Sequence, residues 1–175
     1  MAARTLAGMA RSLRRILAVA ATVLVALGGL GGCGRKEFED RTAIVTVGDA
    51  RTSFTLDECG RDGQTIYVVG RADDGSMFQA VMGLRKDKLT AVARSTGFTL
   101  DADPSRDDTR VGAFGNEAWE RKGGAGAAPG RIDDARLRGS RIQFDGQAVP
   151  LDGADRRVPG AASTHFSLDA RCDRP

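Results

Sequence analysis

The residues best suited to chemistry in this 175-residue chain are three cysteines and a single histidine. Cys33 directly follows a run of apolar and small residues, whereas Cys59 and Cys172 lie far apart in the remaining sequence. A thiolate can attack an electrophile, accept a lipid group, ligate a metal or form a disulfide. Zinc fingers and histidine-rich metal sites need clustered ligands, which this spacing excludes. The chemistry to consider is therefore modification of Cys33 and pairing of the other two thiols.

Residues 1–32 have the pattern of an export signal. A basic stretch ends at Arg14-Arg15, and the following residues 16–30 carry no charge. A membrane-spanning helix needs about 20 apolar residues, so this run is short for a span and typical of a cleaved signal peptide. An uncleaved membrane anchor is the alternative interpretation. The arginine pair leaves both the general secretory route and the twin-arginine route open.

Leu30, Gly31, Gly32 and Cys33 resemble a bacterial lipobox, the recognition motif of lipoprotein signal peptides. Small residues allow a membrane-embedded peptidase to close on extended backbone, and the cysteine thiolate takes a diacylglyceryl group before cleavage. Cys33 is therefore expected to become the first residue of the mature protein and to carry acyl chains. Two chains give stable anchoring, so we expect the protein on the extracytoplasmic face of the cell membrane, tethered by residues 33–42. A plain secretory leader with an unmodified cysteine is the alternative.

The net charge of the mature part argues against a nucleic-acid partner. The whole chain has 26 basic and 23 acidic residues, but four of the arginines lie within residues 1–32. From Cys33 onward 22 basic residues face 23 acidic ones, a net charge of −1. The basic excess typical of nucleic-acid binding is missing. The charges of residues 34–41 also balance, so the tether itself gives no reason to expect electrostatic lipid binding.

Residues 43–175 are expected to form one β-rich extracytoplasmic domain, because apolar and polar residues alternate along them. Strands are expected over 43–47, 52–58, 65–71, 76–84, 89–100 (one bent strand or a pair), 111–122, 136–145 and 164–172, with turns at 48–49, 60–63, 73–75 and 139–140. Residues 65–71 are apolar on both faces, which predicts a central strand, and Gly97 is a candidate for a bulge. Residues 101–110 and 123–130 are expected as loops. The predicted fold is mainly β, an antiparallel sheet, sandwich or rolled half-barrel, after a cleaved N-terminal signal helix.

Cys59 and Cys172 are expected to form a disulfide, because exported chains meet oxidising conditions. Cys172 lies on the apolar face of the last expected strand. Cys59 is out of phase with Phe54 and Leu56, so we expect it at the end of its strand. Two unpaired thiols are the alternative.

The sequence around His165 contains the residue types of a serine hydrolase. Ser163 or Ser167 and Asp169 would complete a Ser-His-Asp set. A triad needs a nucleophile that approaches from a distant element, however, and these residues share one short segment. A solvated polar strand face is the simpler interpretation, and no catalytic residue is predicted.

Two loops and two aromatic residues complete the candidates. Asp101, Asp103, Asp107 and Asp108 have the ligand type that Ca²⁺ prefers, but the segment lacks the glycine and closing glutamate of an EF-hand. Residues 123–130 lack the Lys-Ser/Thr of a phosphate-binding loop. Phe114 and Trp119 are expected to fill the core rather than to stack on a ligand. We therefore expect no metal and no cofactor.

Several of these features together resemble the mycobacterial nineteen-kilodalton lipoprotein antigen family. The matching features are the lipobox, an early strand pair ending at Cys59, the strand 66–70, the segment 139–148 and a closing strand that holds Cys172. The resemblance covers roughly residues 30–84 and 130–175. It implies a surface-exposed, lipid-anchored, non-enzymatic domain with a disulfide between the two cysteines, whose acylated end is sensed by host innate receptors. Family members often carry a long Thr- and Ser-rich tether, which is missing here.

The expected function is that of a non-enzymatic, membrane-anchored component of the bacterial envelope, similar to a surface antigen. A carrier of a lipid or another small apolar ligand is an alternative, suggested by the strand 65–71 beside Met77 and Met82. A hydrolase is a further alternative from a different class.

Overall fold

The computed structural model describes residues 39–106 and 108–173. The expected signal peptide, the lipobox with Cys33, and Asp107 lie outside these residues. The described strands are β1 (Thr42–Val47), β2 (Ala50–Asp62), β3 (Thr65–Arg71), β4 (Met77–Leu84), β5 (Ala91–Asp101), β6 (Arg110–Phe114), β7 (Arg131–Arg138), β8 (Arg141–Pro150) and β9 (Thr164–Arg171), with one helix, α2 (Asn116–Arg121). Within the described ranges, no helix is long and apolar enough to cross a bilayer.

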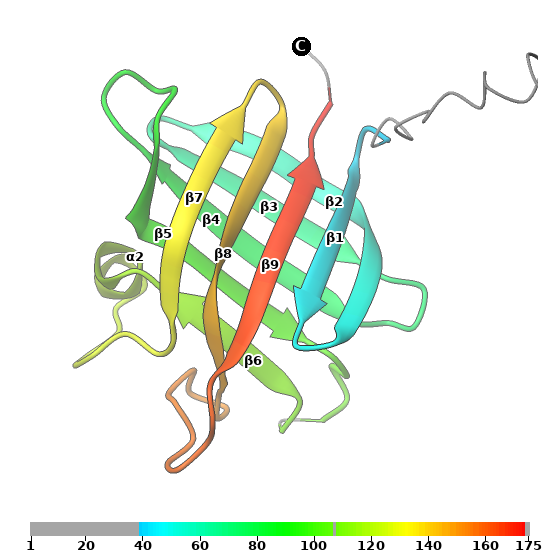
Figure 1. The fold of residues 1–175 in the computed structure, drawn as a ribbon, viewed down its shortest axis with the longest axis vertical. Helices are drawn as coiled ribbons and strands as arrows, with labels where there is room; N and C mark the ends of the chain where they lie inside the picture. Colours follow the sequence, from blue (N-terminus) through cyan, green and yellow to red (C-terminus); the bar gives the residue numbers. More distant parts are fainter. Residues whose placement is uncertain (1–38, 107, 174–175) are drawn as a thin grey trace, which may run out of the picture. The chain divides into compact units, whose positions relative to one another are not determined.

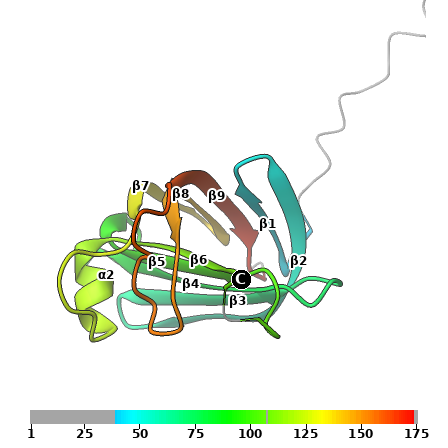
Figure 2. The same cartoon turned by 90° about the horizontal axis from the view of Figure 1, so that it is seen from below.

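The strands form an antiparallel sheet that closes on itself as an eight-stranded barrel. Their order is β6-β5-β4-β3-β2-β1-β9-β8-β7, and a further pairing of β6 with β8 closes the barrel and leaves β7 as an extra strand on β8. That closure uses Val111 opposite Pro150 and Gly112 opposite Val149. The barrel is flattened: β7, β8, β9 and β1 lie on one side, and β3 to β6 lie on the other (Figures 1 and 2). The prediction of a mainly β, antiparallel, rolled fold is confirmed.

Phenylalanine rings fill the interior of the barrel. The alternation seen in the sequence puts one face of each strand inside, and five of the inward residues are Phe54, Phe78, Phe98, Phe144 and Phe166, all at most 2% exposed. Phe98 stacks on Phe166 with a centroid distance of 4.6 Å, and Phe54 meets Phe78 edge-on at 5.0 Å. Burial of one such side chain stabilises a fold by about 1.5–3 kcal/mol, so these rings are a main source of stability.

A bulge in β2 explains the position of Cys59 and corrects the expectation that it ends a strand. The β2–β3 register shifts between Leu56 and Glu58, which reverses the alternation, and Cys59 then lies opposite Val68. β2 continues to Asp62, so the turn expected over 60–63 is displaced to residues 63–64. Cys59 and Cys172 form the expected disulfide, with 5.7 Å between their Cα atoms, within the usual range for such bridges.

Two further strand expectations are confirmed, the central position of residues 65–71 and a bent strand with a bulge near Gly97. β3 is hydrogen-bonded on both sides, but its outer face is not buried, since Tyr67 is 45% exposed. A barrel wall has one face toward the core and one toward solvent, so a strand with apolar residues on both faces need not be buried on both. Residues 91–101 form the single strand β5, whose pairing with β4 is irregular between Val92 and Gly97. The expected bulge is present, and Gly97 is where the regular pairing resumes.

The expected strand over 111–122 is wrong in its second half, where the chain forms α2. Gly115 precedes the helix, and Trp119 on the helix packs against Phe114 at a centroid distance of 5.4 Å. Ala113 and Ala148 point into the barrel, so their neighbours Phe114 and Val149 face outward, where they form a second apolar cluster with Trp119 and Leu151. Both aromatic residues are 5% exposed, which confirms that they fill a core.

Candidate ligand groove

The residues of the hydrolase hypothesis lie along one strand, β9, with Ser167 between His165 and Asp169 and with Ser163 just before the strand. His165 and Asp169 lie four residues apart on β9, about 13 Å along an extended strand. The Asp169 carboxylate accepts hydrogen bonds from Arg141 (Nε to Oδ1, 2.8 Å) and Gln143 (Nε2 to Oδ2, 3.1 Å). Ser163 and His165 are exposed. The region is a polar strand face, and the geometry does not assemble a triad.

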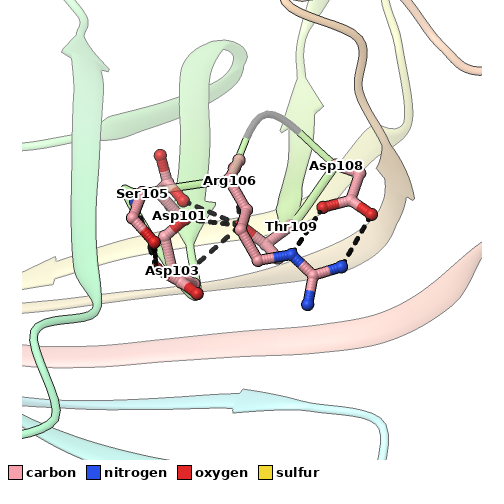
Figure 3. A network of polar contacts seen from close by, with 6 residues as sticks. All are labelled: Asp101, Asp103, Ser105, Arg106, Asp108 and Thr109. Atoms are coloured by element: carbon pink, nitrogen blue, oxygen red, sulfur yellow. Dashed lines mark hydrogen bonds and ion pairs between the residues drawn. The ribbon is translucent and has the colours of Figure 1, made fainter.

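The described carboxylates of the expected Asp-rich loop, Asp101, Asp103 and Asp108, bind partners within residues 101–109 (Figure 3). Asp103 Oδ1 accepts hydrogen bonds from the Ser105 hydroxyl at 2.6 Å and the Ser105 backbone N–H at 3.0 Å, which lower the pKa of Asp103. Arg106 binds Asp108 through Nε and Nη2 at 3.0 and 2.9 Å. Among the residues that the structure describes, no three His, Cys, Asp or Glu side chains are placed to hold a metal ion.

The residues that suggested carriage of an apolar ligand belong to the core. Val68 and Met82 are each 1% exposed and lie in the barrel's main apolar cluster. Met77 is half-buried at the start of β4. The interior residues therefore pack against one another, and the grooves that could hold a ligand lie on the outside of the barrel wall.

A groove of about 780 Å³ lies between the start of β3, the β4–β5 hairpin and α2. The irregular part of β5 builds it, because backbone groups there are freed from the strand ladder and must bind elsewhere. Thr96 O accepts a hydrogen bond from the Gly115 N–H at 2.8 Å, and Ser95 O accepts one from Arg121 Nη2 at 2.7 Å. These bonds attach α2 to β5 and create one wall of the groove.

The charged lining of the groove is predominantly basic. Four basic side chains (Arg85, Lys86, Arg94 and Arg121) face two acidic ones (Asp87 and Glu117). Glu117 is bound by Arg94, whose Nε lies 2.6 Å from Oε1, and by the hydroxyl of Ser95. Backbone N–H groups of Leu89 and Thr90, and then the Thr90 hydroxyl, lower the pKa of Asp87. Lining residues bind Glu117, and residues 89–90 of the hairpin bind Asp87. Because both carboxylates already have partners and basic side chains outnumber them, the lining favours an anionic group.

A second groove of about 480 Å³ continues from the first, since Thr65 and Arg121 line both. Its apolar lining includes Tyr67, Val81, Gly97, Phe114 and Ala118. A Cβ atom at Gly97 would lie 2.7 Å from the Phe114 ring, so glycine is needed for this aromatic to lie across β5. A basic groove that adjoins an apolar one suits a molecule with an anionic head and a small apolar body.

Sequence reasoning missed this groove. Its residues come from three segments, 64–65, 83–95 and 117–121, and follow no motif. The one local signal was the short run of helix-forming residues between Gly115 and Gly123, which could have revealed α2. No protein-family model matches the chain, and a search of curated proteins found no match.

Proposed function

We propose that this chain is a lipid-anchored, non-enzymatic protein of the bacterial envelope, held on the extracytoplasmic face of the cell membrane by acyl chains on Cys33. The observation that carries the proposal is the disulfide between Cys59 and Cys172. Bridges of this kind are typical of exported proteins and rare in reducing compartments. The bridge also uses two of the three cysteines in the chain, which leaves the lipobox cysteine as the remaining thiol.

The resemblance to the nineteen-kilodalton lipoprotein antigen family supports the same role. The resemblance implies a disulfide-bridged, β-rich domain that follows a lipidated cysteine, as the proposal does. It also implies that host innate receptors detect the acylated end. The fold agrees with a binding or display module, and the lipid supplies the localisation.

Acyl labelling of cells that produce the wild-type chain or Cys33→Ala, followed by fractionation, tests the anchor. We expect the wild type to be labelled and in the membrane fraction, and the variant to be unlabelled and either released or unprocessed. Cys172→Ala is the matched control, because it removes a cysteine outside the lipobox and should keep its label. Label on Cys33→Ala, or a wild type without label, would contradict the proposal.

The pair of adjoining grooves favours a second candidate function, binding of an anionic amphiphile such as a fatty acid. The basic lining that includes Arg85 and Lys86 would hold the anionic head, and the apolar groove beside Tyr67 would cover part of the chain. This is the carrier alternative in a form that uses the outside of the barrel.

Native mass spectrometry and titration with palmitate test this candidate. Lys86→Glu should weaken binding about five-fold, the effect of roughly 1 kcal/mol of lost attraction. Arg51→Glu makes the same charge change at the start of β2, away from the groove, and should leave the affinity unchanged. Palmitate that does not bind, or that binds both variants like the wild type, argues against the groove as its site.

A further inference from the structure

The barrel has two unlike ends. Because neighbouring strands run antiparallel, the β4–β5 hairpin (85–90), the turns 63–64 and 139–140 and the start of β1 lie at one end, here called the proximal end (Figure 1). Leu84 N–H donates to Gln64 O at 2.8 Å, and Cys172 N–H donates to Ser140 O at 3.0 Å, which joins these segments. The connections 48–49, 72–76, 102–109 and 151–163 form the distal end.

The two ends differ in charge. In the distal connections, the described residues include seven acidic and three basic side chains. At the proximal end, the hairpin carries Arg85, Lys86 and Lys88, and Arg61 from β2 joins it by donating from Nη2 to Lys88 O at 2.9 Å. The acids beside the hairpin are Asp62 and Asp87, so basic side chains are in the majority there, whereas Glu39, Asp40 and Asp173 lie beside the start of β1 at the same end.

An exposed apolar side chain lies at the tip of this basic hairpin. Leu89 is 73% exposed, the largest exposure among the large apolar residues of the described chain. Asp87 accepts hydrogen bonds from the Leu89 and Thr90 backbone N–H groups at 2.9 and 3.0 Å, which define the turn that presents Leu89. Basic residues beside an exposed leucine are a combination that binds membrane interfaces: the cations attract anionic headgroups and the leucine enters the apolar boundary.

The proximal end is also the end from which the proposed anchor extends. Arg41, next to β1, binds Asp173 beyond β9 at 3.2 Å, so the chain enters the barrel beside its C-terminal strand at this end. Cys33 precedes Glu39 by six residues, which span at most about 20 Å when fully extended. A lipid on Cys33 would therefore keep the proximal end close to the bilayer.

We propose that the β4–β5 hairpin docks on the anionic phospholipid surface of the membrane that holds the anchor, with Leu89 entering the headgroup layer. This inference rests on the proposed lipid anchor. The docking proposal goes beyond the anchor, because the balanced charges of the tether predict no electrostatic contact with lipid. The fold, in contrast, brings Arg61 and the basic hairpin together at the end of the barrel from which the anchor would extend. Docking would orient the acidic distal end away from the bilayer and place the basic groove at the membrane surface.

The test uses the processed, full-length acylated protein in vesicles of phosphatidylcholine alone or with added phosphatidylglycerol. Flotation reports the anchor, with Cys33→Ala as the unanchored control. Limited trypsin digestion with mass spectrometry then reports cleavage after Lys88 at the hairpin and after Arg157 in the distal connection 151–163. We expect cleavage after Lys88 to be roughly five-fold slower on vesicles with phosphatidylglycerol, and cleavage after Arg157 to be unchanged.

Leu89→Ser should remove most of the difference between the two lipids, whereas Val158→Ser, a matched change at a 37% exposed distal residue, should preserve it. Wild-type protein that floats but is cleaved after Lys88 equally on both vesicles overturns the docking proposal and leaves the anchor standing. Protection at Lys88 that does not depend on phosphatidylglycerol also overturns it. Wild-type protein that does not float overturns the anchor and the docking together.

Discussion

Reduction of the Cys59–Cys172 bridge should cause a large loss of stability. The bridge joins residues 113 positions apart in the sequence. It lies at the end of the barrel where β1 begins. In the chain-entropy description, cross-linking a loop of this length removes about 5 kcal/mol of conformational entropy from the unfolded chain at 25 °C. For a domain of this size, a loss of that magnitude lowers the melting temperature by roughly 15 °C.

Urea unfolding with and without reductant measures the effect. Trp119 is 5% exposed and should report unfolding by fluorescence. Reduced wild type retains every atom of the core, so the comparison isolates the cross-link. Mass spectrometry must show the gain of two hydrogen atoms on reduction.

The double variant Cys59→Ala/Cys172→Ala serves as the control for incomplete reduction. Its stability should lie within about 1 kcal/mol of the reduced wild type, because both sulfur atoms lie at the edge of the core rather than in its centre. A reduced protein that unfolds within about 1 kcal/mol of the oxidised one would refute the reasoning. It would mean that the unfolded chain does not gain the freedom that this loop length implies.

Three further predictions concern the core, the outer wall and pH. Phe98→Ala should lower the free energy of unfolding in urea by about 3–5 kcal/mol, because the Phe98 ring is 1% exposed and contacts three other phenylalanines. Tyr67→Ala, at a residue that is 45% exposed, should cost far less, and equal losses would contradict the assignment of Phe98 to the interior. Gly97→Val should lower the melting temperature, because the new side chain would collide with the Phe114 ring. Gly60→Val should be tolerated, since nothing lies within 4 Å of its added Cβ. Calorimetry in which Gly60→Val has the lower melting temperature would refute the contact between Gly97 and Phe114. Hydrogen bonds from Leu89 and Thr90 lower the pKa of Asp87 below its ordinary value of about 3.9. The stability they contribute is complete above the unfolded-state pKa of about 3.9 and is lost as the pH falls through the lower pKa of the folded state. An NMR titration midpoint of Asp87 above its unfolded-state pKa would contradict the turn geometry.

The strands and their inward faces were largely predictable, because a barrel wall obeys the same alternation as any half-buried sheet. β3 and β4 lie where the pattern indicated, and Phe166 and Leu168 on β9 point inward as the spacing required. Cys59 was misplaced because a single extra residue in β2 reverses the alternation, and no local signal marks that residue.

The barrel closure and the groove were beyond sequence reasoning for a different reason. β6 meets β8 through only two residue pairs, Val111 with Pro150 and Gly112 with Val149, and such distant pairing leaves no trace in either segment. α2 is six residues long, too short to show a helical period. The groove needs this helix, since α2 must lie back on β5 before Arg121 can donate its hydrogen bond to Ser95 O.

The position of the disulfide is best understood together with the proposed anchor. β1 lies between β2 and β9, and its first residue, Thr42, pairs with Thr55 on one side and Arg171 on the other. Any pull transmitted from an acylated Cys33 would reach the barrel at this residue and would tend to separate β1 from its neighbours. The bridge ties β2 to the end of β9 just beyond Thr42, so the strands on either side of β1 cannot part there. A reduced barrel should therefore lose protection from hydrogen exchange first at the start of β1 when it is anchored, and the oxidised barrel should retain it.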